Sequence, residues 1–164
     1  MASFEFLAII VSVLGLAASI TYYAIVVSNA NKTQQQQLET RQAQLFMPIF
    51  NQFQNHENMA IWLNIVLDWE WEDYDDFRNK FYSDKDVRTK IHSYMAYLEG
   101  AGILLERDLV DIKMVNELIG SIVVIFWEKM ESVILGTRQR LDMPTYCSGV
   151  ESLYRKIKTL RENR

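Results

Sequence analysis

The stretch FLAIIVSVLGLAASITYYAIVV, from Phe6 to Val27, decides the fold prediction because its twenty-two residues carry no charge. As an α-helix it would be roughly 33 Å long, close to the roughly 30 Å hydrocarbon core of a bilayer. The rest of the chain mixes charged and apolar residues. We therefore predict a short N-terminus over residues 1–5 and a transmembrane helix over residues 6–28.

A cleaved signal peptide is the alternative interpretation of this stretch. Ser28-Asn29-Ala30 resembles a small-x-small cleavage site, but the first five residues contain no Lys or Arg. The apolar run also exceeds the roughly 7–15 residues of a signal-peptide core, which favours a retained anchor. Lys32 and Arg41 follow the span. The positive-inside rule then predicts an outside N-terminus and a cytoplasmic C-terminal domain.

Small residues recur inside the predicted span at spacings of four, three and four. They are Ala8, Ser12, Gly15 and Ser19. On a helix these positions share one face, where small side chains allow a second helix to approach closely. The pattern indicates a membrane-protein partner or a homo-oligomer. The alternative is that small residues are simply common in membrane helices.

The residues after the span predict a polar stalk over residues 29–44 and a cytoplasmic helical bundle over residues 45–164. The stalk contains four consecutive glutamines, which suit either a continuing helix or a flexible linker. Apolar residues then recur at helical spacing, and no useful period-two alternation is present. The fold class predicted is all-α.

Several boundaries inside the bundle follow from local signals. We expect Pro48 to kink or restart its helix, Ser83 to cap a helix, and Asp111 to begin another. The ten apolar residues LIGSIVVIFW, from Leu118 to Trp127, indicate a buried central helix, because they are too few to span a bilayer. A last helix is expected to open at residues 142–144.

Three segments carry a resemblance to a known family. They are RQAQLFMPIFNQF (residues 41–53), LLERDLV (residues 104–110) and GSIVVIFWE (residues 120–128). Over residues 38–162 the chain resembles the prokaryotic membrane-tethered helical domains of domain-of-unknown-function 4760. The resemblance implies a helix near the membrane followed by a small bundle, and it supplies no catalytic residue.

Two charged segments are candidate interaction surfaces. The first, DWEWEDYDD, is interpreted as a solvated acidic turn or a partner-binding patch anchored by its tryptophans, and its spacing does not fit an EF-hand. Its residues are Asp68, Trp69, Glu70, Trp71, Glu72, Asp73, Asp75 and Asp76. The second is a C-terminal basic group that suits lipid headgroups, or merely solubility and the helix dipole. Its residues are Arg155, Lys156, Lys158 and Arg161.

Catalytic chemistry finds little support in the sequence. His56 and His92 are far apart, and the single Cys147 has no cations beside it in the sequence. We predict no metal, no cofactor and no small-molecule substrate, and the net charge of −4 argues against nucleic acid. The predicted function is a non-enzymatic, membrane-anchored interaction module, an accessory or scaffold subunit of a membrane complex. The alternative is a membrane-tethered signalling or regulatory domain.

Overall fold

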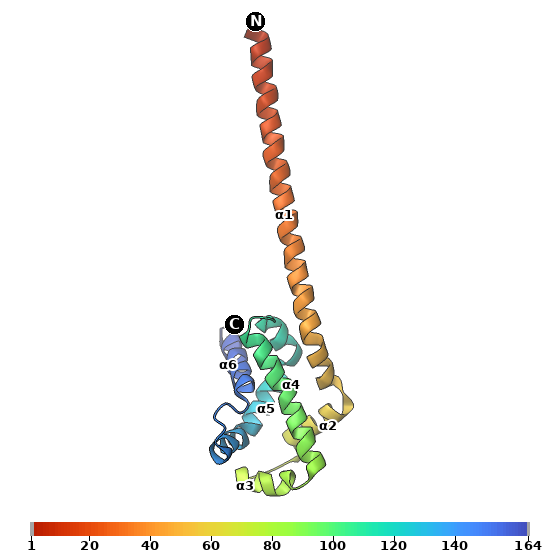
Figure 1. Cartoon of the computed structure of the whole chain (residues 1–164), viewed down its shortest axis with the longest axis vertical. Coiled ribbons are helices and arrows are strands. Elements are labelled where there is room, and N and C mark those ends of the chain that lie inside the picture. The colour runs from red at the N-terminus through yellow and green to blue at the C-terminus, as the bar shows by residue number, and fades with distance from the viewer. Residues whose placement is uncertain (1, 164) are drawn as a thin grey trace. The chain divides into compact units, whose positions relative to one another are not determined.

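The structure is a computed structural model that describes residues 2–163, and it divides the chain into two compact units, Met1–Arg41 and Gln42–Arg164 (Figure 1). Between residues 2 and 163 it contains helices and no strand, which confirms the all-α prediction. In chain order the elements are α1 (Ala2–Gln54), α2 (His56–Leu63), the π-helical turn η1 (Asn64–Asp68), α3 (Tyr74–Phe77), the π-helical turn η2 (Arg78–Tyr82), α4 (Lys85–Glu106), α5 (Ile112–Leu141) and α6 (Ser148–Glu162).

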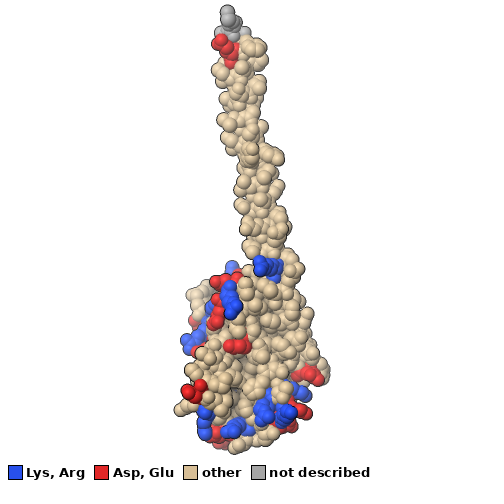
Figure 2. Space-filling model, in the orientation of Figure 1, with Lys and Arg blue, Asp and Glu red and all other residues tan. Residues whose placement is uncertain are grey.

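The first unit consists of the N-terminal part of α1. Its large apolar side chains between Phe4 and Val27 are all exposed, and no part of its most apolar window is buried within the protein. Residues 6–27 contain no Lys, Arg, Asp or Glu, and in Figure 2 they form the tan stretch of the helix below the acidic atoms at its N-terminal end. By length and composition α1 is able to cross a membrane. The α-helix also extends through residues 29–44 without a break.

The restart predicted at Pro48 lies at Asn55 instead. Pro48 is inside α1, which continues to Gln54. Asn55 has an extended backbone with ψ of 136°, and its side chain accepts a hydrogen bond from the backbone N–H of Glu57. This geometry ends one helix and caps the next. The break therefore follows the capping residue rather than the proline.

The core of the second unit forms around α5, which fulfils the expectation of a buried central helix. Ten α5 residues are buried, and they are Val115, Ile119, Gly120, Val123, Phe126, Trp127, Met130, Val133, Ile134 and Thr137. Ile125 is exposed, so the LIGSIVVIFW segment is not enclosed all round. Phe46 and Phe53 of α1 belong to the same buried cluster.

One predicted capping residue and one other predicted helix start are wrong. Asp84, not Ser83, caps α4, because its carboxylate accepts hydrogen bonds from the backbone N–H groups of Asp86 and Val87. The last helix begins at Ser148 rather than at residues 142–144. Asp142 and Cys147 adopt left-handed φ angles of 50° and 56°, which interrupt the helical backbone before α6.

Candidate functional site

The small-residue face of α1 places its polar atoms in internal hydrogen bonds. The Ser12 hydroxyl donates to the Ala8 carbonyl oxygen at 2.8 Å, and the Ser19 hydroxyl donates to the Gly15 carbonyl oxygen at 2.8 Å. A Cβ added to Gly15 would meet nothing within 4 Å. The four small residues therefore form a shallow, exposed face whose hydroxyl groups need no partner from outside the helix.

The acidic cluster turns its tryptophans inward. Trp69 stacks on Phe81 with ring centroids 4.2 Å apart, and Trp71 packs edge-on against Phe77 at 4.9 Å. Both tryptophans are half-buried against the core, and the Lys129 ammonium lies 4.8 Å from the Trp71 ring centroid. Only their exposed edges are open to a partner.

Most carboxylates of this cluster are already engaged within the protein. Asp76 pairs with Lys80 at 2.7 Å, and Glu70 pairs with Lys129 at 3.2 Å. Asp75 pairs with Arg140, and Asp73 caps α3 through the Asp76 backbone N–H. Asp68 and Glu72 are exposed. Among the described residues no group of three or more His, Cys, Asp or Glu side chains is arranged to hold a metal ion.

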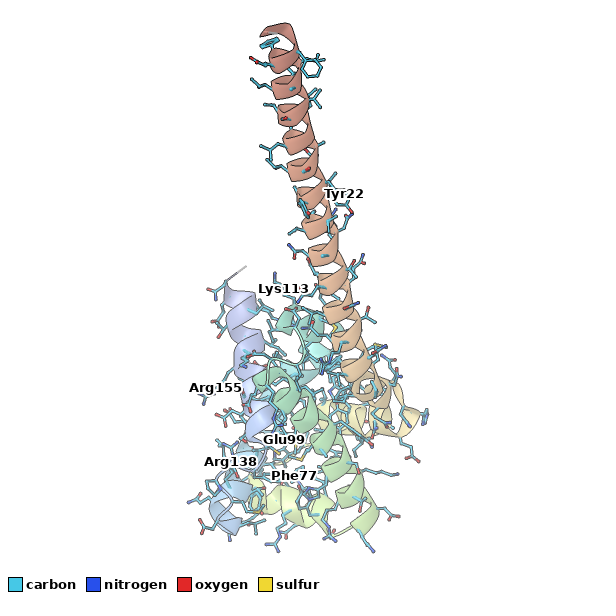
Figure 3. All side chains as sticks on the ribbon, turned by 45° about the horizontal axis from the view of Figure 1, so that its top comes forward. Tyr22, Phe77, Glu99, Lys113, Arg138 and Arg155 are labelled. Carbon is cyan, nitrogen blue, oxygen red and sulfur yellow. The ribbon has the colours of Figure 1, made fainter. Side chains whose placement is uncertain are left out.

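The C-terminal basic residues are also largely paired. Lys158 contacts Glu128 at 3.3 Å, and Arg161 donates to the Asn116 side-chain oxygen at 2.8 Å. Arg155 points outward from α6 and is 74% exposed (Figure 3), although it pairs with Glu151. Lys156 is exposed as well.

Acidic residues share the surface that two of these cations occupy. Arg155 and Lys156 border a hollow of about 640 Å³ that Asp108 and Asp111 also line. The hollow therefore has mixed charge, which weakens its preference for an anion.

Glu99 of α4 contacts the start of α6, and we call this contact the Glu99 joint. The sequence pattern did not predict that these two helices are neighbours. The Glu99 carboxylate accepts hydrogen bonds from the backbone N–H groups of Gly149 at 3.0 Å and Val150 at 2.9 Å. These are N–H groups of the first turn of α6, so Glu99 caps that helix from a neighbouring helix (Figure 3). Cys147, at the N-cap position, provides no side-chain hydrogen bond that caps the helix.

The Cys147 thiol, just before α6, is buried at this joint. Burial raises the pKa of the Cys147 thiol to about 12, and the nearby Glu99 carboxylate adds to the rise. The thiol is therefore protonated near neutral pH. This agrees with the expectation that Cys147 is not an activated thiolate.

A second hollow, of about 750 Å³, lies among η2, α4, α5 and the loop before α6, and we call it the tyrosine hollow. Tyr82, His92 and Tyr146 line it together with Arg78 and Arg88. The Tyr146 hydroxyl lies 3.3 Å from His92 Nδ1. The Arg88 guanidinium donates to the Tyr82 carbonyl oxygen at 3.1 Å.

Burial shifts the titration of the groups in the tyrosine hollow. It raises the pKa of the Tyr82 hydroxyl to about 12 and raises the pKa of Tyr146 as well. The pKa of His92 is lowered, first by burial and then by the nearby Arg88 cation. Near neutral pH the hollow therefore presents neutral phenols and a predominantly neutral imidazole beside two guanidinium cations.

Sequence reasoning missed the tyrosine hollow because its residues come from three separated segments. One signal was available. Arg78 precedes Tyr82 by four residues, and Arg88 precedes His92 by four. Side chains four apart share a helix face, so each pair places a cation beside an aromatic ring. The sequence does not reveal that the two pairs face the same space.

The comparison with known families matches almost the whole chain. The sequence model of the family described as Domain of unknown function (DUF4760) matches residues 3–157. The chain belongs to the DUF4760 family. This confirms the family that the sequence segments indicated. No curated protein and no solved structure matches the chain.

The extent of the DUF4760 match differs from the resemblance read from the sequence. The match begins at residue 3 rather than residue 38, so DUF4760 includes the apolar part of α1 as well as the bundle. It ends at residue 157, before Lys158 and Arg161. The small-residue face, the acidic cluster, the Glu99 joint and the tyrosine hollow all lie within the DUF4760 range.

Proposed function

We propose that this protein is a non-enzymatic, membrane-anchored helical module that docks onto another membrane component as an accessory or scaffold subunit. The observation that carries the proposal is the uncharged segment of α1, whose large apolar side chains are all exposed. Each Val, Leu, Ile or Phe favours an apolar environment over water by about 1.5–3 kcal/mol. A segment apolar on all sides needs lipid or other helices around it.

The polar atoms of the segment support a bilayer as that environment. Ser12, Ser19 and Thr21 each donate to the carbonyl oxygen four residues earlier, at 2.8–2.9 Å. In hydrocarbon an unsatisfied hydroxyl costs several kcal/mol, and these bonds remove that cost. With Lys32 and Arg41 after the span, the bundle lies on the cytoplasmic side.

The partner docks through close packing of helices at the small-residue face. Because the Ser12 and Ser19 hydroxyls are satisfied within α1, they add little cross-helix hydrogen bonding. Open space above Gly15 instead allows a second backbone to approach. The partner is a membrane protein or a second copy of this chain.

The experiment purifies the full-length protein from its native membranes in a gentle detergent and measures complex size and composition. The double variant Gly15→Leu, Ser19→Ile fills the small-residue face, and the complex should shrink while the bundle melts at the same temperature. The control is Ala17→Leu, Ala24→Leu, which adds bulk to the opposite face of the same helix.

The composition of the complex distinguishes the two kinds of partner. A stoichiometric foreign membrane protein identifies an accessory subunit, and a homo-oligomer identifies self-association. Unchanged complex size in the small-face variant, or equal losses in both variants, would refute docking at this face.

A membrane-tethered signalling or regulatory domain is the second candidate. It draws on the helix across Gln34–Gln37, since only a continuous helix transmits a shift or rotation from the membrane. Spin labels placed on either side of these glutamines should give one narrow distance distribution, at about 1.5 Å of rise per residue. A broad distribution would exclude this mechanism.

A further inference from the structure

We propose that the tyrosine hollow binds a small organic carboxylate, with the guanidinium groups of Arg78 and Arg88 holding the acid and the aromatic walls holding the apolar body. This inference goes beyond the proposed docking role, and neither depends on the other. All the residues that carry it belong to the second unit.

The charge around the hollow selects an anion. Arg78 and Arg88 line it, and none of the described residues lining it is an Asp or Glu. Asp142 lies in the sequence between the lining residues Leu141 and Met143, and both Asp142 and Asp86 are exposed and do not line the hollow. Asp84 caps the start of α4. Guanidinium groups bind carboxylates through paired, charge-assisted hydrogen bonds.

A buried hydroxyl in the hollow has an unused hydrogen-bonding capacity. The Tyr82 hydroxyl oxygen is buried and makes no hydrogen bond of ordinary geometry with any described residue. The Tyr146 hydroxyl is a polar neighbour of the Tyr82 hydroxyl, and it acts on the pKa of Tyr82 as a weak hydrogen-bond partner whose geometry falls short of an ordinary bond. Leaving a buried hydroxyl unpaired costs about 1–3 kcal/mol. A carboxylate bound against Tyr82 would accept the Tyr82 proton after a small shift of that side chain toward the hollow, and the new hydrogen bond would remove that cost.

The walls of the hollow suit a flat apolar body rather than a bare inorganic ion. Tyr74, Tyr82, His92 and Tyr146 provide aromatic surfaces, and Leu141 and Met143 provide apolar ones. The Tyr82 and His92 ring centroids are 5.5 Å apart. A volume of about 750 Å³ lies within the usual range for small-molecule sites. The hollow of about 640 Å³ that Asp108 and Asp111 line lacks both the aromatic walls and the uniform charge.

The test measures binding of three probes to the full-length protein in detergent micelles by titration calorimetry, with empty micelles as the blank. Phenylacetate combines a carboxylate with a ring, phenylacetamide is its neutral analogue, and inorganic phosphate is an anion without an apolar body. Phenylacetate should bind saturably, with a dissociation constant of about 1 mM or lower. The two other probes should bind at least about tenfold more weakly.

Variants then locate the site. Arg78→Gln combined with Arg88→Gln should weaken phenylacetate binding at least about tenfold. Lys90→Gln is the matched control, because it removes an exposed cation of α4 that does not line the hollow, and it should leave binding unchanged. Since Arg88 also contacts the Tyr82 backbone, Tyr82→Phe is the second variant. It keeps the ring, removes the hydroxyl, and should weaken binding about tenfold.

Four results would overturn the proposal. The first is no saturable phenylacetate binding. The second is equal binding of phenylacetamide, which would show that the charge is not recognised. The third is equal binding of phosphate, which would show that no organic body is recognised. The fourth is phenylacetate affinity that does not change in the folded variants of the hollow.

Discussion

Helices α4 and α6 approach closely at Gly102 and Gly149, and nearby Gly100 provides a control for a prediction about this contact. A Cβ added to Gly102 of α4 would lie 2.8 Å from the Gly149 Cα and closer still to the Gly149 carbonyl. Gly100, two residues earlier, would place a Cβ at an ordinary 3.7 Å from the Ile49 side chain. The same substitution, glycine to alanine, should therefore have opposite effects at these two positions.

The magnitudes follow from sterics and helix propensity. Overpacking costs about 1–3 kcal/mol, and at Gly102 the clash is with backbone atoms, which cannot rotate away as a side chain does. Alanine regains up to about 1 kcal/mol of helix propensity. We expect Gly102→Ala to lower the free energy of unfolding by about 1–2 kcal/mol. Gly100→Ala should raise it by about 0.5–1 kcal/mol.

The assay is thermal unfolding of the full-length protein in detergent, followed by tryptophan fluorescence. Trp127 is buried in the core and reports its loss. For a domain of this size 1 kcal/mol shifts the melting temperature by about 3–5 °C, so the two variants should move in opposite directions. If they shift together, or if Gly102→Ala melts higher than the parent, then α4 and α6 do not cross at these glycines.

Two further predictions concern charged groups at the first turn of α6. Glu99→Ala removes the acceptor for the Gly149 and Val150 N–H groups and should lower the free energy of unfolding, measured by urea titration, by about 2 kcal/mol. Glu99→Gln retains one oxygen acceptor and should lower it by about half as much. An unchanged free energy of unfolding in Glu99→Ala would refute the capping role of Glu99. The hydrogen bond from Arg138 holds the pKa of Glu151 below its usual 4.5 in the folded protein. The stability that this ion pair contributes is therefore present above about pH 4.5 and is lost as the pH falls through the lower pKa of the folded state. Glu151→Gln should flatten the dependence of the free energy of unfolding on pH in this range, and an unaltered slope would contradict the prediction.

Helical periodicity predicted most of the fold because apolar spacing records which face of each helix is buried. It located the central helix and its start at Asp111, whose carboxylate caps α5. It misplaced the start of α6, because the left-handed backbone of Cys147 has no sequence signal. Cysteine rarely adopts that conformation, which glycine and asparagine usually occupy.

The inward orientation of the tryptophans in the acidic cluster could have been predicted from the sequence. The letters DWEWE alternate between acidic and aromatic residues, and Trp69 has an extended backbone with ψ of 131°. In extended chain successive side chains point to opposite sides, so the tryptophans turn toward the core while the acids face water. The partner-binding patch stays a prediction, and a partner there would meet the acids and the exposed edges of the two tryptophans.

The tyrosine hollow could not have been predicted from the sequence pattern. Periodicity reports the buried face of each helix separately, and it carries no information on how the helices are arranged around a shared space. Tyr82 and Tyr146 are 64 positions apart, yet they line one hollow with His92, whose ring centroid lies 5.5 Å from that of Tyr82 and 6.4 Å from that of Tyr146.

The bundle has side-chain hydrogen bonds between different elements in addition to bonds within a helix such as that of Thr137, and this supports the proposal of an anchor joined to a bundle. In the apolar segment of α1 each Ser or Thr hydroxyl between residues 12 and 21 bonds to its own helix. In the bundle Glu99 and Arg138 satisfy groups on other elements, namely the first turn of α6 and the carbonyl of Tyr146. A helix whose polar groups are all hydrogen-bonded within the helix is suited to a lipid environment. A bundle whose helices are joined by hydrogen bonds around a buried core is suited to fold in water, and a bundle that is fixed in this way presents a defined surface to a partner.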